Sequence, residues 1–314
     1  MQDALESRFI LEFYLAPLAE ITSVEFRELC YECGADICYS EMISAKAISL
    51  GNRKTFSLGR IGKTEKKTFL QLFGSDPEVF KEAAQVILEK ESPYGIDINA
   101  GCPVKKVVGT GSGSMLMENP EKLGKIVKAV RSVTDLPLSV KIRKGFMSPS
   151  YMECAHQIQD NGADLLIVHP RLRSERFSGI SDFNVSVELS DKLNIPVVHS
   201  GDIKTIENVE FFKDTAVSGL MIGRGVLGAP WIFNELKGYE LSVDEKNFYI
   251  KKHLLYYMSI DIDPRFGHLM IKKHASWYSS GMKGSSDFRK KMFEPKQVLN
   301  ETIENVNQFF GIDL

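Results

Sequence analysis

The stretch Asp97–Val107 carries the residues best suited to chemistry. Its sequence is DINAGCPVKKV, in which Cys102 follows a short apolar strand that ends in the carboxamide of Asn99. Gly101 and Pro103 predict a tight turn around the thiol. A cysteine held at a rigid strand end can act as an acid or as a nucleophile. Free cysteine is also among the most buried residue types, so position alone leaves a core role open.

Short apolar segments bounded by turn residues predict β-strands along the first part of the chain. Amphipathic patterns between them predict helices. Asp76 before Pro77 and Asn119 before Pro120 are helix-start signals, and Gly162 is a helix-end signal. The predicted strands are Glu12–Ala16, Ile37–Ser40, Thr68–Phe73, Gly95–Asn99, Leu138–Ile142, Leu165–His169, Val197–Ser200 and Gly219–Ile222. The predicted helices are Pro77–Lys90, Glu121–Val133, Tyr151–Asn161, Asp182–Leu193 and Thr205–Phe212.

This alternation of strands and helices predicts an α/β fold of the (β/α)8 TIM-barrel type, with a doubly wound sheet as the alternative. The pattern changes after Gly238, because residues 243–314 show helical periodicity and no strand pattern. We therefore expect a catalytic barrel over residues 1–238. A small all-helical domain is expected over residues 239–314.

Polar residues of the predicted barrel lie where its strands end, which is where such barrels place their chemistry. Two of these strand ends run into loops that contain glycine. Glycine lets backbone N–H groups approach an anion, and Arg224 adds a guanidinium group, so the two loops predict a phosphate site. The strand-end residues are Gln71, Asn99, Lys141, His169, Arg171, Ser200, Gly201, Asp202, Gly223 and Arg224.

Lys141 lies inside a predicted strand, and a lysine that points into a barrel is costly unless an anionic group meets it. A flavin fits this requirement, since its reduced ring carries negative charge that a nearby cation stabilises. The alternatives are a lysine that points outward or one that pairs with a buried carboxylate. His169 ends another apolar strand, and by itself it is more typical of a hydrogen-bonded core histidine.

The distribution of charge is more informative than the net charge of −2, which argues against a generally basic nucleic-acid-binding protein. Residues 46–67 contain seven basic residues and one acidic residue, and residues 265–296 contain eight and two. Two such clusters could follow a phosphate backbone, although charged runs are more often solvated surfaces.

Cysteine usage favours a reducing, cytoplasmic setting. The chain has five cysteines, an odd number at irregular spacing, which is not a disulfide framework. Cys30 and Cys33 form a C-x-x-C motif, but no second pair follows at metal-ligand spacing and both fall in a helical pattern. We therefore expect a core role for them and no metal site. We also expect neither a signal peptide nor a membrane span, because no sufficiently long apolar run is present.

These segments together resemble the tRNA-dihydrouridine synthases, flavin enzymes that reduce uridine in tRNA. The resemblance covers nearly the whole chain in the same order, and its most specific part is the Asn-x-Gly-Cys-Pro segment around Cys102. Residues 272–278 resemble the RNA-binding helix of the family. The other matching segments are residues 15–22 (LAPLAEIT), 40–46 (SEMISAK), 71–75 (QLFGS), 140–143 (VKIR), 169–173 (HPRLR), 200–203 (SGDI), 221–225 (MIGRG) and 228–233 (GAPWIF).

The resemblance implies an FMN-binding barrel that reduces the C5=C6 bond of specific uridines in tRNA, with NADPH or NADH as reductant. Cys102 corresponds to the proton donor of the family, Asn99 and Arg171 to residues that meet the target base, and Lys272 and Lys273 to tRNA contacts. We expect tRNA as the partner and a monomeric protein. The positions that correspond to FMN contacts are Pro17, Leu18, Ala19, Gln71, Lys141, His169, Ser200, Gly201, Asp202, Gly223 and Arg224.

Four positions depart from the family pattern. Leu18 stands where methionine is usual, a tolerable change because the backbone makes the contact there. Ser200 stands where asparagine is common. Leu172 and Glu175 replace the usual threonine and glutamine, so the resemblance defines the base pocket and the tRNA contacts less closely than the flavin site.

Two other classes of function share part of this pattern. An FMN-dependent dehydrogenase acting on a free pyrimidine, of the dihydroorotate dehydrogenase type, has the barrel, but its small substrate needs no basic helical domain. A non-catalytic RNA-binding module has such a domain, but it has no use for the flavin-facing set Gln71, Lys141, His169 and Arg224.

Overall fold

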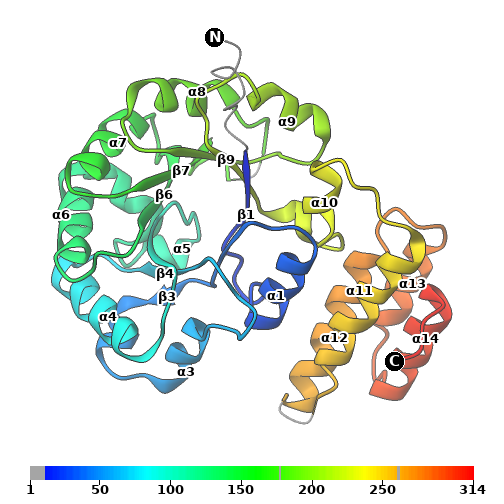
Figure 1. Ribbon diagram of the computed structural model, residues 1–314. Helices are drawn as coiled ribbons and strands as arrows, with labels where there is room; N and C mark the ends of the chain where they lie inside the picture. Colours follow the sequence, from blue (N-terminus) through cyan, green and yellow to red (C-terminus); the bar gives the residue numbers. More distant parts are fainter. Residues whose placement is uncertain (1–10, 177, 260–261) are drawn as a thin grey trace. The chain divides into compact units, whose positions relative to one another are not determined.

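The computed structural model describes residues 11–176, 178–259 and 262–314, and Figure 1 shows their helices and strands. The described chain forms two compact units. The first contains the chain up to Tyr31 together with Ala35–Gly223. The second contains Glu32–Gly34 together with Arg224–Leu314.

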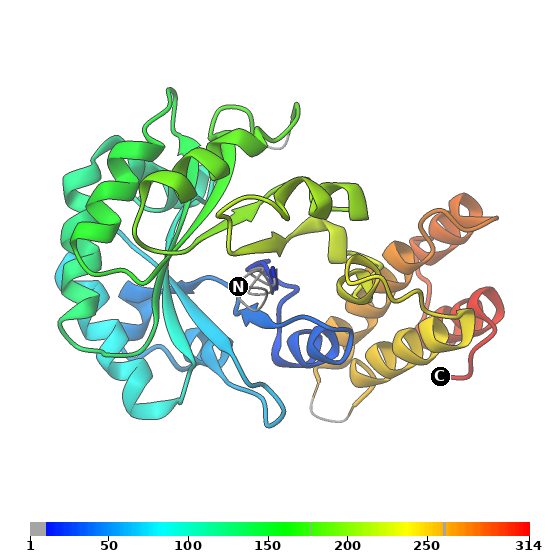
Figure 2. The same cartoon turned by 45° about the horizontal axis from the view of Figure 1, so that its top comes forward.

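Eight parallel strands close into a barrel in the first unit (Figure 1, Figure 2). The last of the eight strands pairs with the first, and the second pairs with the third, so the sheet closes on itself. A further strand of two residues, β3 (Ile43–Ser44), pairs with the end of β4. The eight barrel strands are β1 (Glu12–Leu15), β2 (Ile37–Tyr39), β4 (Thr68–Phe73), β5 (Gly95–Ala100), β6 (Leu138–Gly145), β7 (Leu165–Leu172), β8 (Val197–Ser200) and β9 (Gly219–Ile222).

Helices connect most of the strands and cover the outside of the barrel, as Figure 2 shows. Two of them begin at the predicted caps: Asp76 accepts hydrogen bonds from the N–H groups of Glu78 and Val79, and Asn119 accepts one from Lys122. The helical elements are α1 (Val24–Glu32), α2 (Ala45–Ser49), α3 (Arg53–Phe56), η1 (Ser57–Gly59), α4 (Pro77–Lys90), α5 (Lys105–Val108), η2 (Gly113–Glu118), α6 (Pro120–Arg131), α7 (Tyr151–Asp160), α8 (Phe183–Lys192) and α9 (Ile206–Phe212).

The strand side chains alternate between two apolar cores. Outward-facing residues such as Leu70, Ile98 and Val140 pack against the surrounding helices in the larger core. Inward-facing residues fill the barrel interior, where the rings of Tyr39 and Phe69 stack with centroids 4.9 Å apart. Because side chains alternate along a strand, the residue two positions after an inner-core residue also faces the interior. Such residues lie near the ends of the strands, where the connecting loops begin.

The elements of the second unit are all helices, joined by turns and loops, among the residues that the structure describes. Helix α12 packs against α11, α13 and α14. The buried core of the unit includes His253, His274 and Tyr278. The ring of Tyr278 stacks on that of Trp231, with centroids 5.9 Å apart. The elements are η3 (Arg224–Val226), α10 (Ile232–Leu236), α11 (Val243–Tyr256), α12 (Pro264–Tyr278), α13 (Ser285–Met292) and α14 (Leu299–Phe310).

The predicted barrel followed by a helical segment is confirmed. All eight predicted strands are present, and Thr68–Phe73, Val197–Ser200 and Gly219–Ile222 have the predicted bounds. Strands β6 and β7 run three residues further than predicted and carry Arg143 and Arg171. The two compact units meet in sequence at Gly223 and Arg224, so residues 224–238 belong by their contacts to the helical unit. The catalytic and tRNA-binding roles given to residues 1–238 and 239–314 stay predictions.

Candidate active site

Five of the predicted site residues face the inside of the barrel. Gln71, His169 and Ser200 each lie two residues beyond a member of the inner core, and Lys141 lies beside Ile167 of that core in the next strand. Asn99 pairs in register with Lys141 across β5 and β6. The barrel therefore gathers a carboxamide pair, a lysine, a histidine and a hydroxyl on one inner surface.

The two carboxamides belong to a chain of buried hydrogen bonds. Asp97 accepts one from Ser139 Oγ at 2.6 Å and one from Gln71 Nε2 at 2.6 Å. Gln71 Oε1 accepts one from Asn99 Nδ2 at 2.8 Å. Asn99 Oδ1 then accepts one from the backbone N–H of Cys102 at 2.9 Å. The turn that carries the thiol is thus tied to the barrel interior through side chains.

Cys102 is nearly buried, with 9% of its surface exposed. Its carbonyl accepts hydrogen bonds from both the N–H and the hydroxyl of Ser114, at 3.1 and 2.9 Å. Burial raises the pKa of the thiol, although Arg143 and Lys141 oppose this change. The thiol is therefore protonated near neutral pH, a state suited to an acid rather than to a thiolate nucleophile.

Lys141 is partly exposed at the inner surface, whereas its neighbours along β6 are buried. Burial and the charge of Arg143 lower the pKa of its ammonium to about 8, which leaves it mostly charged at neutral pH. Burial and the cations Lys141, Arg143 and Arg171 lower the pKa of His169 to about 2. His169 is therefore neutral and presents an uncharged imidazole to the barrel interior.

Residues 200–202, which begin at the end of β8, are held in place from three sides. Arg171 donates to Asp202 Oδ2 at 2.5 Å, and the N–H of Ser181 donates to the same oxygen at 2.9 Å. His199 Nε2 lies 2.8 Å from the carbonyl of Gly201. Gly201 has φ of 133°, and a Cβ atom there would lie 2.6 Å from Ser181 Oγ, so only glycine fits.

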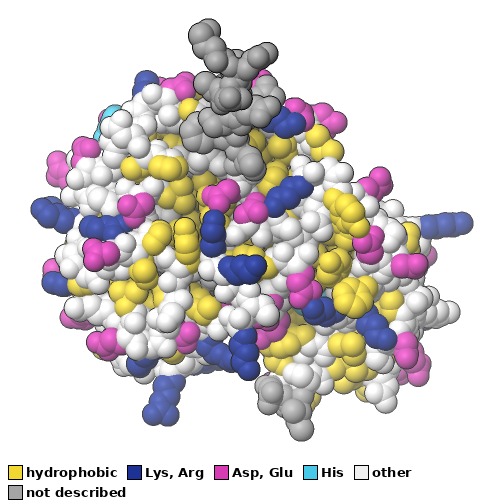
Figure 3. All heavy atoms as spheres, in the orientation of Figure 1, with side chains coloured by type: hydrophobic (Ala, Val, Ile, Leu, Met, Phe, Trp, Pro, Cys, Tyr) yellow, Lys and Arg dark blue, Asp and Glu magenta, His cyan; other side chains and the backbone are white. Residues whose placement is uncertain are grey.

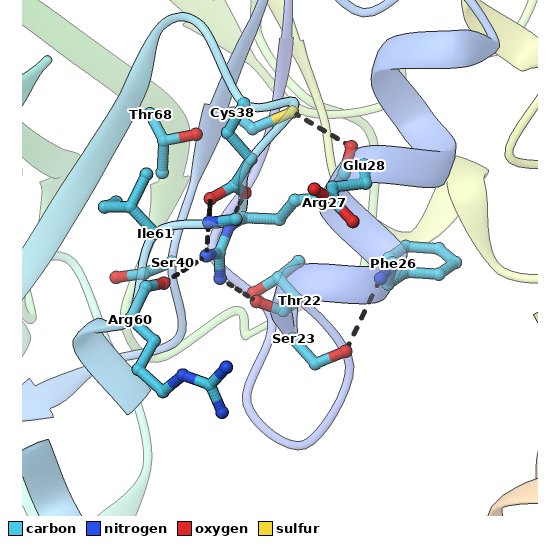
Figure 4. A network of polar contacts seen from close by, with 12 residues as sticks. Thr22, Ser23, Phe26, Arg27, Glu28, Cys38, Ser40, Arg60, Ile61 and Thr68 are labelled. Carbon is cyan, nitrogen blue, oxygen red and sulfur yellow. Dashed lines mark hydrogen bonds and ion pairs between the residues drawn. The ribbon is translucent and has the colours of Figure 1, made fainter. Parts of the chain in front are cut away.

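The loop after β1, which contains Pro17, Leu18 and Ala19, is closed by Thr22. The hydroxyl of Thr22 accepts from the N–H of Leu18 and donates to its carbonyl, both at 3.1 Å. Arg27 contacts the end of this loop: its Nη1 donates to the carbonyl of Thr22 at 2.7 Å, as Figure 4 shows. Its Nε pairs with Glu65 at 2.5 Å. This buried ion pair is a structural support for a predicted flavin contact.

Gly223 and Arg224 follow β9 directly. A Cβ atom on Gly223 would meet only Ala16, at 3.8 Å, so the backbone there is open on that side. Arg224 is exposed and begins η3 as the first residue of the second unit. Among the residues that the structure describes, no group of three or more His, Cys, Asp or Glu residues is placed to hold a metal ion.

The predicted tRNA contacts Lys272 and Lys273 lie on α12 and are partly exposed. The ammonium of Lys273 lies 5.4 Å from the ring centroid of Trp277. Tyr278, by contrast, is buried and hydrogen-bonded to His253 at 2.8 Å. Tyr278 is therefore a core residue, whereas Trp277 is partly exposed beside a lysine.

A local group of positive charge on the second unit lies in the segment after α12. The last turn of α13 carries three basic side chains, all of them exposed: Arg289, Lys290 and Lys291. Figure 3 shows one face of the molecule, on which basic and acidic side chains alternate instead of forming one large basic field.

Sequence reasoning missed the buried side chains behind the site. Asp97, Ser139 and Tyr39 form a hydrogen-bonded chain inside the barrel, with Tyr39 donating to Ser139 at 3.2 Å. A signal was present, because Asp97 lies two residues before Asn99 in an apolar strand and must share its face. His199 gave no such signal, since it faces α8 and bonds to Ser186 Oγ at 2.7 Å.

Solved structures with the same architecture show the class of fold. A 2-naphthoyl-CoA reductase in complex with 2-naphthoyl-CoA is similar with a TM-score of 0.53 and 12% identity, over 73% of this chain and 50% of that one. A morphinone reductase in complex with tetrahydroNAD is similar with a TM-score of 0.52 and 11% identity, over 74% of this chain and 88% of that one. These likenesses establish a TIM-barrel fold shared with oxidoreductases.

The family is shown by sequence. The family model for dihydrouridine synthases matches residues 14–310. A tRNA-dihydrouridine synthase B from Escherichia coli K12 is 32% identical over 307 residues, which is 94% of each chain. A probable tRNA-dihydrouridine synthase from Rickettsia conorii is 31% identical over 293 residues, 88% of this chain and 86% of its own. The chain belongs to the dihydrouridine synthase family, as its sequence predicted. Membership in this family implies a flavin cofactor and tRNA as the substrate.

Proposed function

We propose that this protein uses FMN and a reduced nicotinamide, NADPH or NADH, to reduce the C5=C6 bond of specific uridines in tRNA, with Cys102 as the proton donor. The observation that carries this proposal is the thiol itself. It is nearly buried, burial raises its pKa, and Asn99 holds the backbone of its turn at the end of β5, within the same barrel as the inward-facing Lys141.

The residues of the barrel suit a flavin mononucleotide. Lys141 offers a charged amine at the inner surface, where it favours a ring that gains negative charge. Gly223 leaves the backbone open after β9, and Gly201, after the neighbouring β8, has the positive φ that favours glycine; such glycines suit a phosphate-binding loop. Bound FMN would supply the hydride that reaches C6 of the uracil ring. Gln71, His169 and the loop Pro17–Ala19 complete the proposed contacts.

The protein groups then have separable tasks. The Cys102 thiol gives its proton to C5 and is reprotonated from solvent, which suits a group whose raised pKa keeps it protonated at rest. Asn99 holds the turn with its oxygen. Nη1 of Arg171 is buried and has no hydrogen-bond partner among the described residues, so it is the donor that we assign to the target base.

A base inside folded tRNA must leave its stack to reach a barrel interior. The helical unit offers the lysines and arginines of α12 and α13 to the phosphates of the tRNA. The same unit argues against the alternative, a dehydrogenase for a free pyrimidine, because a small substrate needs no such surface.

Two experiments test the proposal. Nucleoside mapping of tRNA from a strain that lacks this protein should show the loss of dihydrouridine at specific positions, and expression of the protein should restore it. The purified protein should also be yellow and release FMN on denaturation. Unchanged dihydrouridine in the deletion strain, or a protein that binds no flavin even when FMN is added, contradicts the proposal.

A further inference from the structure

Asp97 is a fully buried carboxylate to which the proposed chemistry assigns no step. It lies in the middle of β5, and a carboxylate at such a position is costly unless its oxygens are hydrogen-bonded. Both oxygens are satisfied: Oδ1 accepts from Ser139 Oγ and Oδ2 from Gln71 Nε2, each at 2.6 Å. These two hydrogen bonds offset the cost of burying the carboxylate and fix its orientation.

The position of Asp97 fixes the direction of the amides above it. A carboxylate oxygen accepts hydrogen bonds, so Gln71 turns its amide nitrogen toward Asp97 and its amide oxygen toward Asn99. Asn99 must then offer its own nitrogen to Gln71, which leaves Oδ1 facing the turn. There Oδ1 accepts from the N–H groups of Cys102 at 2.9 Å and Gly101 at 3.2 Å.

The opposite orientation fails at the turn. If both amides were reversed, Asn99 would present its NH₂ group to the N–H groups of Gly101 and Cys102, and donors would face donors. Buried donors without acceptors are destabilising, so one orientation is strongly preferred. The chain of hydrogen bonds begins at the Asp97 carboxylate, which can only accept, and ends at the turn that carries the thiol.

We propose that Asp97 is a positioning residue that sets, through Gln71 and Asn99, the orientation of the turn that carries Cys102. The kinetic consequence rests on the proposed role of Cys102 as the proton donor, whereas the positional consequence does not. Asp97 acts on the reaction by holding the thiol where its proton can be delivered.

This arrangement tolerates a change in the charge of Asp97. Burial raises its pKa to about 7, while hydrogen bonds from Ser139 and Gln71 and the charge of Lys141 lower it. A proton on Asp97 can reside on Oδ1, because the Ser139 hydroxyl can accept as well as donate. Oδ2 then still accepts from Gln71, so the direction of the amides is the same in both protonation states.

The test uses the reactivity of Cys102 as a readout that needs no turnover. Cys102 is 9% exposed, and the other four cysteines are 0% exposed, so limited alkylation by iodoacetamide reports on this thiol. Asp97→Leu removes both acceptor oxygens at similar size. Asp97→Asn keeps an acceptor for Gln71 and removes the charge. Ser139→Ala removes the other hydrogen bond of Asp97 and is the matched control at the same depth.

In Asp97→Leu, the alkylation rate of Cys102 should rise roughly tenfold as the turn loosens, the effect of one lost hydrogen bond. Oxidation of the reduced holoenzyme by tRNA should fall about 10²-fold, the effect of a small misplacement of a reacting group. Asp97→Asn and Ser139→Ala should remain close to the unchanged protein in both measurements. Unaltered alkylation in Asp97→Leu, or equal losses in Asp97→Asn and Asp97→Leu, overturns the proposal.

Two further measurements keep the outcomes distinct. If Asp97→Leu does not fold, Gln71→Met breaks the same chain of hydrogen bonds with Asp97 intact and must raise alkylation in the same way. Cys102→Ala separates this inference from the proposed function. Full tRNA reduction by Cys102→Ala removes the thiol from the mechanism, and the alkylation result for Asp97→Leu stands or falls independently of it.

Discussion

Arg171 and Asp202 form an ion pair with 2.5 Å between Nη2 and Oδ2, and the arginine side chain is only 2% exposed. The pair joins the end of β7 to the loop after β8, 31 residues further along the chain. Arg171 also donates to the carbonyls of Ser178 at 3.0 Å and Gly179 at 2.7 Å. The guanidinium therefore supports the loop in which we predict the phosphate site, and its buried Nη1 has no hydrogen-bond partner among the described residues.

This pair predicts that the carboxylate of Asp202 has a structural role. Asp202→Ala should lower the free energy of unfolding by roughly 3 kcal/mol, since it leaves a buried guanidinium without its partner. It should also weaken FMN binding, because Gly201 loses its support. Asp202→Asn keeps an acceptor for Ser181 and Arg171 and should lose less of both. Urea unfolding followed by circular dichroism measures the first effect, and equal stability of Asp202→Ala and the unchanged protein contradicts it.

The exposed guanidinium of Arg224 should bind the phosphate of FMN. Arg224→Ala should raise the Kd for FMN roughly 10- to 100-fold, the usual effect of a lost charged hydrogen bond. Arg224→Lys keeps the charge without the forked geometry, so its Kd for FMN should lie between those of Arg224→Ala and the unchanged protein. Titration of the flavin-free protein with FMN, followed by quenching of flavin fluorescence, gives the Kd. An unchanged Kd in Arg224→Ala places the phosphate elsewhere.

Lys272 and Lys273 should contact tRNA through its phosphates. Their joint replacement by alanine should raise the apparent KM for tRNA and reduce the slope of log K against log salt by about one unit for each lost contact. Lys125→Ala with Lys128→Ala, two exposed lysines on α6, is the matched control. A salt slope that stays the same in the Lys272 and Lys273 variant shows that these lysines are only solvated.

The helical unit should lose stability in acid. Burial lowers the pKa of His253 to about 3 and holds that of His274 well below its usual range. The unfolded chain therefore binds protons that the folded unit does not. The stability that the two neutral histidines contribute is fully present above about pH 6.5 and is lost as the pH falls toward 3. Both tryptophans, Trp231 and Trp277, lie in this unit, so their fluorescence follows its unfolding. His253→Gln should flatten the dependence of stability on pH, and parallel curves for the two proteins contradict this.

Much of the fold could be predicted because it depends on local pattern. Thr68–Phe73 is a short apolar run between polar segments, and Pro77–Lys90 has both a capping aspartate and a first-turn proline, so both elements have the predicted bounds. Short elements such as β3 and α3 have too few residues for periodicity to identify them. The extension of β7 to Leu172 depends on its pairing with β6, which is a tertiary property.

The sequence predicted which residues form the site, but not the contacts that join them. Alternation along the strands, together with the resemblance, placed Gln71, Asn99 and Lys141 at strand ends of the barrel, and the structure brings them to one inner surface. The ion pair between Arg171 and Asp202 joins two segments that no local pattern relates. The same is true of the contact of Asp97 with Ser139, 42 residues away.

The central claim concerns the Cys102 thiol, and the most direct measurement follows two half-reactions of Cys102→Ala in the holoenzyme. Reduction of the bound flavin by nicotinamide should be nearly unchanged, because that step needs the flavin site and not the thiol. Oxidation of the reduced enzyme by tRNA should slow roughly 10²- to 10⁴-fold, the usual contribution of a positioned general acid. Cys102→Ser should slow nearly as much, since a hydroxyl is a far weaker acid. Full speed in the tRNA step, or equal loss in both steps, contradicts the account.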